Sequence, residues 1–101
     1  MALRNPGQAL GARVIEQGET VVGAATIQAI TGSRTDVGEV YLYNIHAAQI
    51  LYIGGPGVTV ANGMPIEALS YFPFPIPIDR AQDLFVIASG AGTGLRWLVV
   101  R

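Results

Sequence analysis

His46 is the first residue to consider for chemistry, because it is the only histidine in the chain. Catalysis would require a nucleophile or an acid beside it, and a metal site would require further ligands. The chain contains no cysteine, which excludes disulfides, Cys-ligated zinc and thiol chemistry. His46 stands at the end of an expected strand, and we expect it to be a structural or exposed polar residue.

Two pairs of carboxylates also invite the idea of acid–base work or a calcium site. Asp79 and Asp83 lie close in sequence, but nothing sets the separation between carboxylates that such chemistry requires. Glu16 and Glu19 flank an expected turn at Gln17-Gly18, where solvated carboxylates are common. We therefore predict no catalytic role for either pair.

Two glycine-rich loops, at 54–57 and 90–94, resemble phosphate-binding loops. A phosphate loop leads into a helix N-terminus, and the Walker type requires a lysine. Each loop here leads into an expected strand, and the chain has no lysine. Both loops are therefore interpreted as turns. The sequence predicts no catalytic residue, no metal ligand and no cofactor. We therefore expect that the protein is not an enzyme.

The composition indicates a subunit of something larger. Half of the residues are hydrophobic and 13% are charged, whereas soluble domains average about 25% charged. Small domains have a large surface for their volume, so we interpret the missing charge as surface that a partner protein buries. No apolar run is long enough for a membrane-spanning helix. The six positive charges are scattered arginines, so nucleic acid is not an expected partner.

The N-terminal residues 1–12 are predicted to form an extended arm, because Pro6, Gly7 and Gly11 interrupt them; a short helix over 9–15 is the alternative. They lack an apolar signal segment, which predicts synthesis in the cytoplasm. Residues 13–101 are predicted to form one β domain.

Turn residues divide this domain into short strands. The expected elements are a hairpin over 14–22, a strand or bulged strand over 24–30, a polar loop at 31–36, a strand at 40–45 that returns through Ala47-Ala48 to a strand at 49–53, a short strand at 58–60, a type I′ turn at Asn62-Gly63, a one-turn helix at 79–82, and strands at 83–88 and 95–100.

The segment Tyr71–Ile78 carries three prolines in alternation. In a strand, Pro73, Pro75 and Pro77 would all face one side and offer it no hydrogen-bond donor. Such a strand must lie at a sheet edge or pack against something other than a sheet. The intervening Phe72, Phe74, Ile76 and Ile78 would then enter the core. The alternative is a polyproline-like connector.

Several expected strands are apolar on both faces. Leu95, Trp97 and Val99 would share one face, and Leu98 and Val100 the other. An ordinary antiparallel sheet exposes one polar face to water, so a second apolar face predicts a partner on the outer side. The fold class predicted is all-β: a single antiparallel β-sandwich, jelly-roll-like, with the extended N-terminal arm.

The exposed or buried state of the large aromatic side chains decides their role. They pack within the sheet or core, contact a partner protein or stack on a sugar, and the sequence leaves all three open. They are Tyr41, Tyr43, Tyr52, Tyr71 and Trp97.

From about residue 24 onward, the order of strands and glycine turns resembles a group of small phage and prophage structural proteins. The resemblance rests on the segments 40–45, 51–55, 57–60, 63–66 and 83–90. It implies a compact β-sandwich used as a capsid decoration (cement) protein, or as a head-fibre or tail module, commonly a homotrimer. The proline-rich segment replaces the polar glycine turn usual in that group.

These observations lead to the hypothesis of a virion structural protein, made in the host cytoplasm. It would be a capsid decoration protein that binds copies of itself and the major capsid protein or another virion protein. Leu3, Arg4 and Asn5 of the arm and Pro73, Pro75 and Pro77 are the predicted interface residues. The alternative is a tail or head-fibre module that contacts a host glycan.

Overall fold

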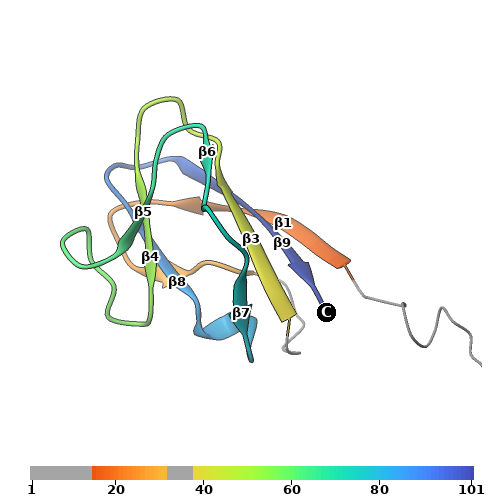
Figure 1. Ribbon diagram of the computed structural model, residues 1–101. Coiled ribbons are helices and arrows are strands. Elements are labelled where there is room, and N and C mark those ends of the chain that lie inside the picture. Colours follow the sequence, from red (N-terminus) through yellow and green to blue (C-terminus); the bar gives the residue numbers. More distant parts are fainter. Residues whose placement is uncertain (1–14, 32–37) are drawn as a thin grey trace, which may run out of the picture.

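Short antiparallel strands make up the described part of the chain. The computed structural model describes residues 15–31 and 38–101 (Figure 1). Their elements are β1 (Ile15–Val22), β2 (Ile27–Gln28), β3 (Gly38–Asn44), β4 (Leu51–Gly54), β5 (Met64–Ile66), β6 (Ser70–Tyr71), β7 (Ile76–Ile78), the 3₁₀ helix η2 (Ala81–Asp83), β8 (Phe85–Ala88) and β9 (Thr93–Val100).

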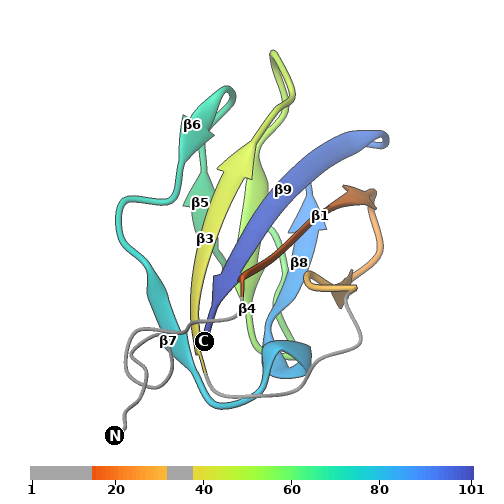
Figure 2. The ribbon, with the colours of Figure 1, turned by 90° about the vertical axis from the view of Figure 1, so that its right-hand side faces the viewer.

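The strands form two sheets that pack face to face. The first sheet has the order β1-β9-β3, and both β6 and β7 pair with the outer side of β3. The second sheet has the order β2-β8-β4-β5. Figure 2 shows the first sheet in front of the second, with β1 at one side and β6 and β7 at the other. The predicted all-β antiparallel sandwich is confirmed. Its jelly-roll connectivity stays a prediction, and the arm at 1–12 lies outside the described residues.

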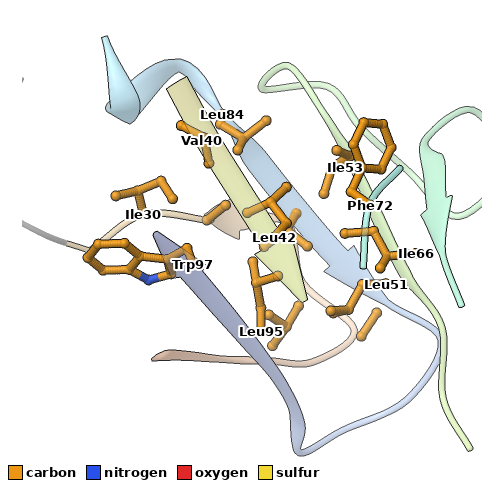
Figure 3. Close-up of a cluster of buried hydrophobic side chains, with 14 of the residues drawn as sticks. Ile30, Val40, Leu42, Leu51, Ile53, Ile66, Phe72, Leu84, Leu95 and Trp97 are labelled. Carbon is orange, nitrogen blue, oxygen red and sulfur yellow. The ribbon is translucent and has the colours of Figure 1, made fainter. Parts of the chain in front are cut away.

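Alternate residues of each sheet supply the core between them (Figure 3). Leu95, Trp97 and Val99 of β9 are buried, and the residues between them face outward. Leu51 and Ile53 of β4 face them from the second sheet. The other buried members of this cluster are Val22, Ala29, Ile30, Val40, Leu42, Ile66, Phe72, Leu84, Val86 and Ala88.

Trp97 forms a polar connection across the core. Its indole Nε1–H donates to the hydroxyl of Thr20 (3.2 Å), and that hydroxyl donates to the carbonyl of Ala29 (2.7 Å). The ring lies over Gly18 of β1: a Cβ there would approach its Cε2 to 2.9 Å and its Cη2 to 3.0 Å. The absence of a side chain at Gly18 therefore makes room for the indole.

Asn44, at the end of β3, forms another connection. Its amide nitrogen donates to the carbonyls of Gln49 (2.8 Å) and Ile66 (3.0 Å), and its carbonyl oxygen accepts from the backbone N–H of His46 (2.9 Å). The side chain is fully buried. It thus satisfies three backbone groups where the chain leaves the first sheet and enters the second.

The predicted hairpin over 14–22 is wrong. Ile15–Val22 is one continuous strand whose partner is the distant β9, with Gly18 opposite Trp97. Gly18 signals close packing rather than a turn. Glu16 and Glu19 therefore do not flank a turn: they lie within β1, beside Arg101 (3.2 Å) and Arg96 (3.5 Å).

Four predictions between residues 24 and 63 also need correction. The strand expected at 24–30 is reduced to β2, and no strand forms at 58–60, which leads into a turn at 60–62. The chain at 49–53 does not return beside β3, because β4 belongs to the second sheet. Asn62-Gly63 is not a type I′ turn: neither residue has positive φ, and the Asn62 side chain accepts from the N–H of Thr59 (2.7 Å).

The proline-rich segment forms the outer edge of the first sheet, as predicted, but in two pieces. The carbonyl of Leu42 accepts from the N–H of Phe72 (2.9 Å), and Ile76 and Ile78 pair with β3. Pro77 lies between these two residues, so its backbone nitrogen faces away from β3. Residues 72–75 are not strand, and the prediction for Phe74 is wrong, because its side chain is exposed.

Candidate functional site

The outer side of the first sheet carries a shallow concavity of about 900 Å³. Register aligns two rows of side chains across it. One row runs Glu19, Arg96, Tyr43, Tyr71, and the other runs Gln17, Leu98, Tyr41. We call this set of outward side chains the tyrosine face. Strand alternation places it directly opposite the buried residues of the same strands.

Aromatic rings dominate the exposed surface of the tyrosine face. Tyr71 is 72% exposed and Tyr41 is 40% exposed. The rings of Tyr43 and Tyr71 contact each other, with centroids 4.4 Å apart and planes tilted by 50°. Each tyrosine offers an apolar ring and a hydroxyl, the combination that suits a partner surface or a sugar.

Charge on the tyrosine face is paired. Arg96 Nε lies 3.5 Å from Glu19 Oε1, and both side chains are largely exposed. Such an exposed pair adds little stability, but it leaves no isolated charge for a partner to desolvate. Within the described residues, the face contains neither a histidine nor a serine or threonine among its lining side chains. The exposed rings beside a paired charge suit a binding surface.

The outer side of the second sheet is also apolar. Phe85 and Ile87 of β8, Tyr52 of β4 and Pro65 of β5 point away from the core, opposite the buried Val86, Leu51 and Ile66. No residue in the four strands of this sheet is charged. We call these four outward residues the uncharged face. The sequence prediction of strands with two apolar faces is thus confirmed for β8.

The predicted interface prolines Pro73, Pro75 and Pro77 do not line the concavity of the tyrosine face. Pro73 and Pro77 are exposed and Pro75 is half-buried, and all three lie along the β6–β7 edge. Leu3, Arg4 and Asn5 lie outside the described residues. His46 stabilises a turn, since its Nδ1 accepts from the N–H groups of Ala48 and Gln49, both at 3.0 Å.

Sequence reasoning did not group the polar members of the tyrosine face. Gln17 and Glu19 were assigned to a turn, so their alignment with Leu98 and Arg96 was missed. The signal that could have found them is the alternation of Ile15, Gln17, Glu19 and Val21, which fits one face of a continuous strand.

Comparison with protein families, curated proteins and solved structures finds no match for this chain. Within residues 15–31 and 38–101, no helix is long and apolar enough to span a membrane. The same residues contain no cluster of three histidines or carboxylates that could hold a metal ion. The geometry of the two faces therefore carries the functional argument.

Leu69, directly before β6, holds an unfavourable backbone conformation. Its φ is 54°, in the left-handed region, and its side chain is 57% exposed. We expect Leu69→Gly to raise the free energy of unfolding by about 0.5–1 kcal/mol, because relief of the left-handed strain exceeds the added entropy of glycine in the unfolded chain. Urea denaturation followed by circular dichroism measures this change. Val60→Gly, at an exposed residue without positive φ, should not stabilise; equal gains from both would contradict the prediction.

Proposed function

We propose that this chain is a structural subunit of a larger assembly, namely a virion decoration (cement) protein that bridges neighbouring shell subunits. The observation that supports this is the pair of outer faces on opposite sides of one sandwich, one rich in exposed tyrosine rings and the other without charge. A domain with one such face can bind one partner, whereas two opposed faces can bind two partners at once. Burial of apolar area, at about 25 cal/mol per Å², would supply the driving force.

The choice of a virion rests on the resemblance of the strand and glycine-turn segments to small phage structural proteins. The same resemblance supplies the expected partners: the major capsid protein or another virion protein, and further copies of this chain, commonly as a homotrimer. Synthesis in the host cytoplasm followed by binding to the shell is part of this proposal. A protein with this role requires no catalytic centre and no cofactor.

The proposal predicts that each face is needed for binding to shells. Purified chain would be mixed with empty shells of the major capsid protein from the same source, and bound protein measured by co-sedimentation. Tyr71→Glu on the tyrosine face and Ile87→Glu on the uncharged face should each weaken binding by about ten-fold or more, because each places a charge in a desolvated contact.

A matched control uses the same change outside both faces. Val60 is an exposed apolar residue in the turn between β4 and β5, and Val60→Glu should bind shells like the unaltered chain. Circular dichroism of each variant checks that the sandwich is intact. Failure of the unaltered chain to bind shells, or binding that neither face variant alters, would refute the proposal.

A second candidate, a tail or fibre module that binds a host glycan, is favoured by the tyrosine face alone. Its exposed rings lie beside Gln17, Glu19 and Arg96, and rings next to planar polar groups suit stacking and hydrogen bonding to sugars. A glycan array distinguishes the two roles. Saturable binding to one polysaccharide class that Tyr71→Ala abolishes, without shell binding, would support the glycan module.

A further inference from the structure

The two edges of the first sheet differ in how they are protected. Sheet edges present unpaired backbone groups, and natural proteins commonly block them. The β6–β7 edge carries Pro77 at the outward position between Ile76 and Ile78, and Pro73 and Pro75 remove two further donors from the segment that joins β6 to β7. The β1 edge is an eight-residue strand without proline or lysine. Only one of the two edges is therefore closed to further pairing.

Hydrogen-bond direction shows which groups of β1 are unpaired. The carbonyl of Gly94, at the start of β9, accepts from the N–H of Ile45 beside β3 (3.1 Å). Backbone groups alternate in direction along a strand. Leu95, Trp97 and Val99 therefore direct their N–H and C=O groups to the opposite side from Gly94, toward β1. Their partners there are Thr20, Gly18 and Glu16, which direct theirs toward β9.

The intervening residues of β1 direct their N–H and C=O groups away from the sheet. They are Ile15, Gln17, Glu19 and Val21. Among residues 15–31 and 38–101, no backbone hydrogen bond outside the β1–β9 ladder satisfies these groups. Ile15 is also 60% exposed and Val21 66% exposed, so the edge is both unpaired and apolar at its two ends.

We propose that a second copy of this chain pairs with this edge, β1 against β1 in antiparallel orientation, about a two-fold axis at Gly18. This register places Ile15 opposite Val21 of the other copy and Gln17 opposite Glu19. Each outward-directed residue then exchanges both backbone hydrogen bonds with its partner. Apolar residues meet at the two ends and polar residues meet in the middle, so the strand is complementary to itself.

Neighbouring registers lack this complementarity. An axis at Glu19 would put the two Glu19 carboxylates directly opposite each other, which is destabilising. An axis at Gln17 would put Glu19 opposite the apolar Ile15. At Gly18 the two strands can approach closely, because no side chain of either copy lies at the axis.

The resulting assembly limits itself. The first sheets of the two copies form one continuous sheet, and both of its outer edges are then the proline-blocked β6–β7 edges. No further copy can add by strand pairing, which gives a closed dimer rather than a fibre or the homotrimer that the resemblance implies. The contact is made by the outward backbone groups of β1 and involves neither the tyrosines nor the uncharged face, although Gln17 and Glu19 also belong to the tyrosine face. The inference goes beyond the proposed function and does not depend on it.

Sedimentation equilibrium of the complete chain tests the contact. We expect a dimer whose dissociation constant rises by about ten-fold or more in Val21→Lys, because a lysine replaces the apolar partner of Ile15. Gln17→Pro removes an outward donor at an edge position and should also yield monomers. Val60→Lys, in the turn between β4 and β5, is the matched control and should remain dimeric. Circular dichroism confirms folding of each variant.

Cysteine cross-linking tests the register, since the chain contains no cysteine of its own. The double variant Ile15→Cys/Val21→Cys should form disulfide-linked dimers on oxidation, because opposed Cα atoms at about 5.5 Å suit a disulfide. Glu19→Cys alone should not. A monomeric or trimeric unaltered chain, unchanged dimerisation in Val21→Lys, or efficient cross-linking of Glu19→Cys would each overturn the proposal.

Discussion

Asn44→Asp lowers the free energy of unfolding by about 3–5 kcal/mol at neutral pH, as expected for an unpaired buried charge. The substitution keeps the shape of the side chain but replaces two N–H donors by oxygen. In the unaltered chain, the carbonyls of Gln49 and Ile66 accept from the Asn44 amide at 2.8 and 3.0 Å. In the variant, a carboxylate faces the same two carbonyls. Chemical denaturation at several pH values measures the loss.

The pH dependence of this variant has a definite sign. Burial and the two facing carbonyls raise the folded-state pKa of the new carboxyl above its unfolded value. The free energy of unfolding of the variant is therefore highest below the unfolded-state pKa, about 3.9. It falls as pH rises through the folded-state pKa. Relative to the unaltered chain, the variant should recover stability as pH falls from neutral toward that value.

Asn62→Asp is the matched control for this change. Asn62 is exposed and uses its side-chain oxygen to accept from the N–H of Thr59, a role that aspartate retains. Its stability should change by less than about 0.5 kcal/mol. A similar loss in both variants, or a loss at Asn44 without pH dependence, would show that Asn44 does not connect the sheets through its two donors.

Trp97→Ala is expected to lower the free energy of unfolding by about 3–5 kcal/mol, because it leaves a cavity between the sheets. It also removes the indole that donates to the Thr20 hydroxyl. Gly18→Ala in the otherwise unaltered chain should cost about 1–3 kcal/mol, since the added methyl overlaps the ring.

Combining these two changes gives the sharper test. Once the ring is absent, the methyl at position 18 has space, and the cost of Gly18→Ala should disappear in the Trp97→Ala background. Gly57→Ala is the control, because no atom lies within 4 Å of its Cβ position and it should be nearly neutral in both backgrounds. An equal cost of Gly18→Ala in both backgrounds would contradict packing of the ring on Gly18.

The class of fold could be predicted because it depends on local patterns. Alternating apolar residues and glycine turns located β3, β4, β8 and β9, and the alternating prolines identified the edge. The partner of each strand could not be predicted in this way. Gly18 looks like a turn residue in isolation, and its actual role depends on Trp97, which is far away in sequence. Asn44 likewise appears to end a strand, whereas its amide connects two sheets.

For the same reason, only part of the candidate site could be predicted from the sequence. The tyrosines were recognised as residues that could bind a protein or a sugar, because ring chemistry is local. Their neighbours Gln17, Glu19 and Arg96 come from β1 and β9, which meet only through long-range pairing. The exposure of the aromatic side chains could not be predicted either. Trp97 is buried and Tyr71 is exposed, although the sequence leaves the same roles open for both.

The position of β9 between β1 and β3 has a consequence for synthesis. Translation produces β1 and β3 long before β9, so the first sheet lacks its middle strand while the chain is still on the ribosome. During that interval β1 has no strand partner and β3 can pair only with β6 and β7, so apolar residues of both strands remain accessible to chaperones and to other nascent chains. Distant pairing of this kind also slows folding. The sandwich therefore forms after β9 is released from the ribosome, rather than progressively as the chain grows.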